Sequence, residues 1–193
     1  VALGVKRPNN APGVLVNDPA PDPDSGEVPE TRTYIATALR DIAGLVAESA
    51  PSNASDFIDV YTSSQGVEVT LPDLADNVDL TGIRLYRSTQ GEFFFVKEFP
   101  INQQNAAFYD TVPAEELGMP VPSFGWTEPP DGLTGLVNMP NGVVAGFVNR
   151  DVYFCEPYRP YAWPIKYMQS VDYEVVGLGV LDTTLVVLTT GEP

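Results

Sequence analysis

The residue types that most enzymes use for nucleophilic catalysis are scarce in this chain. Its 193 residues contain no histidine and one cysteine, Cys155. Without histidine, Ser-His-Asp and Cys-His systems cannot form, and most zinc sites are excluded as well. Cys155 ends the apolar run Val152-Tyr-Phe-Cys, so we expect a small buried core residue and not a reactive thiol. The chain contains neither the GxxxxGK[ST] nor the GxGxxG phosphate loop.

Carboxylates are the remaining candidates for catalysis or metal binding. One acidic cluster lies near the N-terminus: Asp18, Asp22, Asp24 and Glu27. These side chains could offer oxygen ligands to Ca²⁺, but prolines interrupt them and the DxDxDG spacing is lacking. We expect a solvated acidic loop there, and we predict no metal ion and no other cofactor for this protein.

Two further carboxylates, Asp172 and Glu174, flank Tyr173 on one face of an expected strand. We expect them to form ion pairs with Lys166 or Arg159. A glycosidase needs two carboxylates that face each other across a sugar, and the sequence contains no pattern that places two acids in this way. We therefore predict that the protein is not an enzyme.

The most distinctive segment is 153–164, with the sequence YFCEPYRPYAWP. Exposed Tyr and Trp rings can stack on sugars or anchor a protein interface. The candidates for either role are Tyr158, Tyr161, Trp163 and, in a second proline-rich stretch, Trp126. Alternatively, the rings pack inward at a rigid corner whose backbone the prolines restrict. An indole of Trp163 that faces solvent would indicate a stacking platform, whereas a buried one, which we favour, would indicate scaffolding.

The elements that must position these residues are predicted to be β-strands. The 19 prolines and 16 glycines are spread along the chain, which is typical of many short strands joined by turns. Between residues 32 and 112, strand-like runs recur at a spacing of roughly ten residues, as expected for a small β-sandwich. In 82–87, Ile83, Leu85 and Arg87 face one way, and Arg84 and Tyr86 the other. Ser63-Ser-Gln-Gly is a hairpin signal between 57–61 and 67–71, and helix is weak everywhere except 37–46 and 114–117.

Three other segments complete the predicted organisation. Residues 1–31, rich in Pro, Asn and Asp, are expected to form an extended arm that lies on a neighbouring chain, although 13–16 could pair as an edge strand. A proline-rich linker covers 113–132, with Trp126 packed on a domain face. Residues 133–193 are predicted to form an antiparallel β-meander. The pattern of apolar strand, tight turn and apolar strand occurs twice in it, as in successive propeller blades. An ordinary meander fits that pattern equally well.

Charge and hydropathy limit the function further. The chain has 26 acidic and 10 basic residues, a formal net charge of −16. Such a charge repels nucleic-acid phosphates and anionic lipids, so we do not expect specific DNA or RNA binding. No run approaches the roughly 20 apolar residues of a membrane helix, and we expect no membrane insertion. Since the chain begins with Val1 and not Met, we expect a processed or partial product.

Several of these segments together resemble a family of bacteriophage virion proteins. The stretch 142–164, GVVAGFVNRDVYFCEPYRPYAWP, is similar to the family pattern "NG-apolar-AGF…YFSEPY-P-AWP", with Cys155 in place of the usual Ser. Residues 31–37, 48–52 and 83–88 resemble the fibronectin-III-like module of the same proteins. Residues 126–131, WTEPPD, match their "W-PPD" joint, and 176–179 and 187–191 match the strands that follow. The likeness covers most of 31–193, and the turn at 44–52 departs from the family pattern.

The resemblance implies a structural component of the virion tail, assembled in the host cytoplasm. It implies the hub or nozzle of a short tail: a ring of identical copies through which DNA passes without sequence-specific binding, with an adaptor on the portal side and tail fibres around it. The implied fold is a fibronectin-III-like sandwich followed by the start of a β-propeller that continues beyond residue 193. Two alternatives remain: a carbohydrate- or receptor-binding adhesin module of a tail fibre, and a glycan-degrading enzyme.

Overall fold

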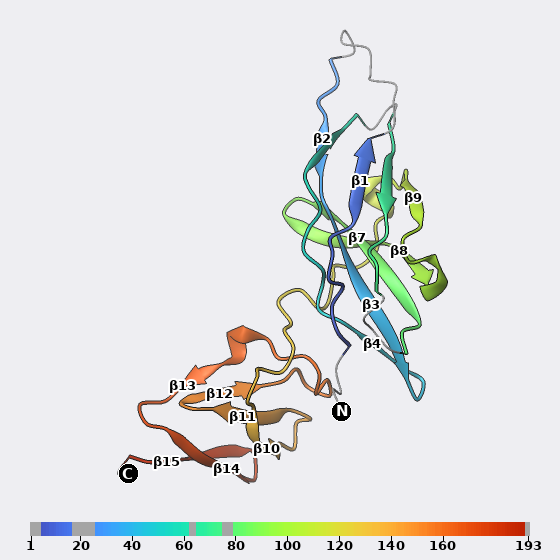
Figure 1. Cartoon of the computed structure of the whole chain (residues 1–193). Coiled ribbons are helices and arrows are strands. Elements are labelled where there is room, and N and C mark those ends of the chain that lie inside the picture. Colours follow the sequence, from blue (N-terminus) through green and yellow to red (C-terminus); the bar gives the residue numbers. More distant parts are fainter. Residues whose placement is uncertain (1–4, 17–25, 62–64, 75–78, 192–193) are drawn as a thin grey trace. The chain divides into compact units, whose positions relative to one another are not determined.

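The chain is built from antiparallel β-sheets, which confirms the predicted all-β class (Figure 1). The computed structural model describes residues 5–16, 26–61, 65–74 and 79–191. Within these residues the helical segments are short 3-10 turns: η2 (Ile101–Gln103), η3 (Ala114–Glu116) and η4 (Ile165–Tyr167). The described part of the chain contains no helix long and apolar enough to span a membrane.

The chain divides into two compact units, Val5–Phe124 and a second unit that begins at Gly125. The boundary lies within the expected 113–132 linker. Residues 118–121, however, pair with β8 (Glu92–Pro100): Gly118 N–H donates to Phe95 O (2.8 Å) and Val121 N–H donates to Phe93 O (2.8 Å). The first half of the expected linker is therefore an edge of the first unit's sheet.

The first unit has a four-stranded sheet in the order β4-β3-β7-β8. Its strands are β3 (Tyr34–Ile42), β4 (Leu45–Glu48), β7 (Gly82–Thr89) and β8. A three-stranded sheet, β1-β6-β9, contains β1 (Gly13–Val16), β6 (Val67–Thr70) and β9 (Ala107–Asp110). A two-stranded sheet pairs β2 (Glu30–Arg32) with β5 (Ile58–Val60). Apolar residues of β3, β6 and β7 form the buried core, among them Ile83, Leu85, Val67 and Val69.

Three expectations for this unit differ from the structure. Residues 13–16 form an edge strand as expected, but β1 pairs with β6 of the same chain, so this part of 1–31 is not a free arm. The weak helix signal at 37–46 is wrong, because β3 pairs there with both β4 and β7, and tertiary pairing overrides local propensity. The 57–71 hairpin is wrong as well, since β5 pairs with β2 whereas β6 pairs with β1 and β9.

A repeated serine motif protects the outer edge of β3 beyond the point where β4 ends. Every third residue from 49 to 55 is a serine, and each makes the same two bonds: its N–H donates to a β3 carbonyl, and its Oγ accepts that residue's N–H. The pairs are Ser49–Ala38, Ser52–Ala36 and Ser55–Tyr34, with distances between 2.8 and 3.1 Å. The hydroxyl thus takes the place of a strand carbonyl, and the buried N–H groups of β3 are satisfied.

A buried ion pair connects the four-stranded sheet with the three-stranded sheet. Arg87 Nη1 donates to Asp110 Oδ2 (2.8 Å) and to Val112 O (2.7 Å), and Tyr34 Oη donates to the same Asp110 oxygen (2.8 Å). Both charged side chains are fully buried. Removing one partner of such a pair leaves an uncompensated charge in the interior, which destabilises far more than losing an exposed pair.

A second polar cluster is centred on the buried carboxylate of Glu48 in β4. Its Oε1 accepts from Thr37 Oγ1 (2.7 Å) and Tyr86 Oη (2.5 Å), and its Oε2 accepts from Arg84 Nη1 (2.7 Å). Burial, and then the nearby Glu48 carboxylate, raises the pKa of Tyr86 well above its ordinary value. Burial and Asp110 raise the pKa of Tyr34 in the same way.

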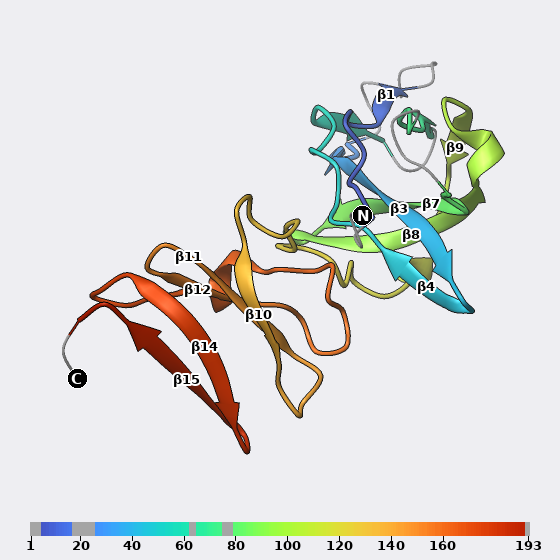
Figure 2. The ribbon, with the colours of Figure 1, turned by 60° about the horizontal axis from the view of Figure 1, so that its bottom comes forward.

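The second unit is a four-stranded antiparallel meander followed by a hairpin. The meander has the order β10-β11-β12-β13, from β10 (Thr134–Asn138), β11 (Val144–Val148), β12 (Asp151–Phe154) and β13 (Gln169–Ser170). The hairpin pairs β14 (Val175–Leu181) with β15 (Thr184–Thr189). Figure 2 shows the hairpin beside β10, and β14 contacts both β10 and β11.

We predict that Asp110→Ala destabilises the first unit by about 3–5 kcal/mol, because Arg87 is left as an unpaired buried charge. The matched control is Glu98→Ala, which removes a half-exposed partner of Arg84 and is expected to change stability by about 0.2–1 kcal/mol. Urea unfolding followed by far-UV circular dichroism measures both. Equal losses in the two variants would contradict a dominant role of the buried pair.

We also predict a loss of stability at alkaline pH that depends on Tyr34 and Tyr86. The pKa of each is raised in the folded state, whereas unfolded tyrosine ionises near pH 10. The unfolded chain therefore releases these protons first, so stability is intact below about pH 10 and falls above it, by up to about 1.4 kcal/mol per pH unit for each tyrosine. Urea unfolding of Tyr34→Phe and Tyr86→Phe between pH 8 and 11.5 should show a shallower fall than the wild type; an identical slope would refute this linkage.

Candidate functional site

Trp163, the residue that distinguishes a stacking platform from scaffolding, is buried. Only 3% of its surface is exposed, and its Nε1–H donates to Pro160 O (2.9 Å). Its backbone N–H donates to Thr127 O (3.0 Å), while Thr127 Oγ1 donates back to the carbonyl of Trp163. Pro160 and Pro164 restrict the chain on both sides. The backbone of Trp163 therefore fastens the 157–164 loop to Thr127, and the indole N–H closes the loop on itself at Pro160.

Trp126 is also buried and belongs to the same cluster. Its ring meets Tyr161 edge to face, with centroids 6.2 Å apart, and the Arg159 guanidinium lies 5.3 Å from its centroid. Tyr161 is half-buried. Edge-to-face rings and a cation over an indole are both favourable arrangements, so these side chains form a packed corner with Trp163.

Tyr158 differs from the other three rings, because 79% of its surface is exposed. Its backbone has a φ of 60°, a left-handed conformation that bulky residues rarely adopt. The conformation is fixed by a hydrogen bond from Tyr158 N–H to Gly142 O (2.7 Å). The ring lies against Gly142, where a Cβ would be 2.5 Å from it. The structure thus brings Trp126, Tyr161 and Trp163 together and leaves Tyr158 as the exposed ring of the four.

A mainly apolar hollow of about 430 Å³ lies between the 139–143 turn and the end of β12, and Pro157, which precedes Tyr158 in the chain, is one of its lining residues. Met139, Val143, Phe154, Pro157 and Tyr167 contribute its apolar walls, and Lys166 lies on its rim with its Nζ 5.2 Å from the Tyr167 ring centroid.

Cys155, which also lines this hollow, is almost fully buried, as predicted. Its Sγ accepts the Val144 N–H (3.0 Å), and burial raises the pKa of the thiol. A raised pKa lowers the thiolate fraction, so this cysteine is a packing residue and not a nucleophile.

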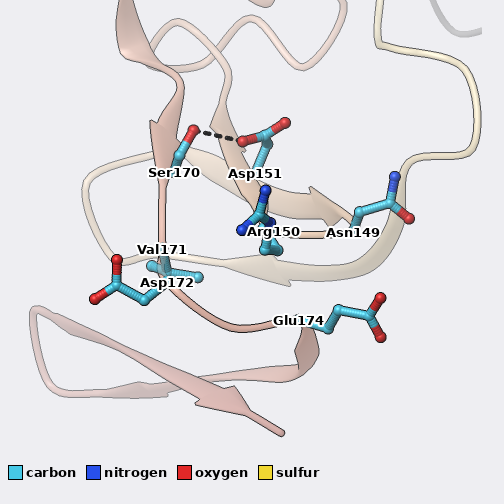
Figure 3. A pocket seen from close by; sticks show the side chains of 7 residues that line it. All are labelled: Asn149, Arg150, Asp151, Ser170, Val171, Asp172 and Glu174. Atoms are coloured by element: carbon cyan, nitrogen blue, oxygen red, sulfur yellow. Dashed lines mark hydrogen bonds between the residues drawn. The ribbon is translucent and has the colours of Figure 1, made fainter. Parts of the chain in front are cut away.

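A second, polar pocket of about 570 Å³ lies where β11 turns into β12 (Figure 3). Asn149, Arg150, Asp151, Ser170, Asp172 and Glu174 line it. Ser170 Oγ donates to Asp151 Oδ1 (2.5 Å), and Val171 N–H donates to Arg150 O (2.9 Å). The carboxylates of Asp172 and Glu174 are exposed.

The predicted ion pairs of Asp172 and Glu174 with Lys166 or Arg159 do not occur among the described residues. These charged residues lie within 15 residues of one another in the sequence. In the structure, however, Lys166 lines the hollow at one end of the meander and Asp172 and Glu174 line the pocket at the other. Of the N-terminal acidic cluster, Asp18, Asp22 and Asp24 lie outside the described residues. Within the described ranges, no group of three or more Cys, Asp or Glu side chains could hold a metal ion.

One exposed surface was missed by the sequence analysis: the outer face of the β14–β15 hairpin. Leu181, Val186 and Leu188 are 40–69% exposed, and Gly177 and Gly179 lie opposite Leu188 and Val186. The signal was present in the sequence, because 184–188 carries apolar residues at both odd and even positions. A strand that is apolar on both faces is typically covered on both.

No protein-family model matches this chain, and no curated protein matches it either.

We predict that Trp163→Ala lowers the stability of the second unit by about 3–5 kcal/mol, as expected for loss of a buried Trp. Differential scanning calorimetry of the full chain measures this. The control is Ile165→Ala in the same loop, where 59% of the side chain is already exposed and little change is expected. A Trp163→Ala variant that melts like the wild type would show that the indole does not hold the corner together.

Proposed function

We propose that the chain is a structural component of a bacteriophage tail, where copies form a hub or nozzle ring around the DNA exit channel. In this proposal the ring joins an adaptor on the portal side and carries tail fibres around it. The role is assembly and not catalysis.

The observation that supports this proposal most directly is the exposed outer face of the β14–β15 hairpin. Its outer face presents Leu181, Val186 and Leu188 to solvent, and β15, with the sequence TLVVLT, contains no charge and no proline. Exposed edge strands normally carry Lys, Pro or a bulge that blocks further pairing. A strand without these features is suited to contact with more polypeptide.

Three other properties support a tail component. A four-stranded meander followed by a hairpin that packs on it is compatible with the start of a β-propeller, and the segments at 142–164 and 126–131 resemble virion proteins. The net charge of −16 suits a channel wall to which DNA phosphates do not adhere.

The alternative of an adhesin is less well supported by the aromatic residues. A sugar-stacking platform built from Tyr158, Tyr161 and Trp163 requires exposed rings, but Trp163 is 3% exposed and Tyr161 is half-buried. The third alternative, a glycan-degrading enzyme, requires two acids that converge across one cleft. In the polar pocket, Asp151 is bonded to Ser170, and the Asp172 and Glu174 side chains point in different directions (Figure 3).

We predict that Leu188→Lys prevents incorporation of the chain into virions, because a charge would have to be buried in the hairpin contact. The free energy of unfolding of the variant should differ from that of the wild type by no more than about 0.5 kcal/mol, as for most exposed positions. Complementation with the variant gene, followed by quantification of the chain in purified virions by mass spectrometry, measures incorporation. The matched control is Val28→Lys, an 83% exposed residue of the first unit, which should be incorporated normally.

A cryo-electron microscopy reconstruction of virions that carry the chain tests the proposed function itself. A ring of copies around the tail channel is the expected result. Density for the chain only at a fibre tip would favour the adhesin alternative, and virions without the chain would overturn the proposal.

A further inference from the structure

The two hollows of the second unit lie at opposite ends of the same pair of strands. In the β11–β12 pairing, Val148 lies opposite Asp151 at the turn, and Ala145 lies opposite Phe154 at the other end. The polar pocket surrounds the turn at 149–151. The apolar hollow lies beyond Phe154, next to the 139–143 turn. We call these the turn end and the corner end.

The charges at the two ends are opposite in sign. Residues 125–193 contain three basic side chains, Arg150, Arg159 and Lys166. Two of them, Arg159 and Lys166, belong to the corner end, against one carboxylate there, Glu156, which accepts from Tyr167 Oη (3.1 Å). The turn end has the exposed carboxylates of Asp172 and Glu174, together with Asp151, against the single cation of Arg150. Among the described residues, Lys166, Arg159, Asp172 and Glu174 form no ion pair with one another or with other groups.

The backbone of Tyr158 gives an independent reason to regard the corner end as a contact surface. The other described non-glycine residues with positive φ are small or carry amides or carboxylates: Ala43, Asp79, Gln90, Asn105, Asn149 and Asp182. Tyr158 is the one aromatic residue among them, and its ring gains little burial in return, since 79% of it is exposed. Folding alone would favour Gly or Asn at this position. Residues held in sparsely populated backbone conformations cluster at functional sites such as ligand clamps, so Tyr158 marks the corner end as a candidate contact surface.

We propose that copies of this chain associate head to tail, with the corner end of one second unit docking on the turn end of the next. Tyr158 is the aromatic anchor of this contact, and Lys166 faces the carboxylates of Asp172 and Glu174 on the neighbouring copy. This inference rests on the proposed function and specifies which surfaces join the copies of the ring.

The charges favour a second copy of this chain as the partner that binds at these two ends. With a net charge of −16, two copies repel each other over most approaches, and they attract where local charges are opposite. Each copy carries both complementary surfaces, at opposite ends of one rigid sheet. A contact between different surfaces of identical chains leaves one surface free at each step, so it generates a closed ring or an open filament.

Sedimentation velocity of the full chain across a concentration series, at physiological ionic strength, tests the contact. The wild type should form oligomers larger than dimers. Lys166→Glu and Asp172→Lys should each weaken association at least tenfold, and the double variant Lys166→Glu/Asp172→Lys should regain most of it because the charges are exchanged across the same contact. Glu115→Lys makes the same charge change as Asp172→Lys on an exposed residue of the first unit, and it should associate like the wild type.

Tyr158→Gly separates a contact role from a folding role. Glycine adopts positive φ without strain, so the variant should melt at the wild-type temperature or above it and yet lose association at least tenfold. A lower melting temperature with wild-type association would overturn the role of Tyr158. Wild-type chain that stays monomeric throughout, or a double variant without recovery, would overturn the head-to-tail contact. If virions nevertheless contain a ring of copies around the tail channel, these results would overturn only the proposed contact. The proposed function would then still hold.

Discussion

The fold of the first unit depends on satisfying the backbone of β3, a strand with buried side chains on both of its faces. On one side β7 supplies the hydrogen bonds to residues 34–39 of β3. On the other side β4 covers only the last four residues, and beyond them Ser49, Ser52 and Ser55 supply both a backbone donor and a hydroxyl acceptor. An unsatisfied buried N–H costs about 1–3 kcal/mol, so this strand could not stay in the interior without them.

The polar groups of the core follow from the position of β3. Tyr34 begins the strand and shares the Asp110 carboxylate with Arg87, so that one buried cluster links β3 and β7 with β9. Thr37, three residues further along β3, donates a hydrogen bond from its hydroxyl to the Glu48 carboxylate. Buried charged groups of this kind specify one register, because a shift by one residue would bring them out of contact. The first unit thus has a core whose strand register is fixed by buried polar contacts.

The second unit places its distinctive groups on surfaces and not in a cleft. The buried rings of Trp126 and Trp163 fix the corner, and this fixed corner holds the exposed ring of Tyr158 in place. The proposed assembly rests on two surface features: the opposite charges at the two ends of the meander, and an apolar hairpin face with no charge on β15. The described residues contain no group of acids arranged for metal binding, and Cys155 is occupied in packing.

Much of the fold followed from the sequence alone. Strand positions are local properties of β-branched and aromatic runs between Pro and Gly turns, so the all-β class and the burial of Cys155 could be predicted. The partners of each strand could not be predicted, because pairing joins segments far apart in the chain. The predicted hairpin of 57–61 with 67–71 is wrong for this reason. The same holds for burial and exposure. The alternation in 82–87 put Arg87 on the face of Ile83 and Leu85, but only the carboxylate of Asp110, 23 residues away, makes that burial possible. Likewise, only the folded meander decided that Lys166 and Asp172, near neighbours in the sequence, lie at opposite ends of one sheet.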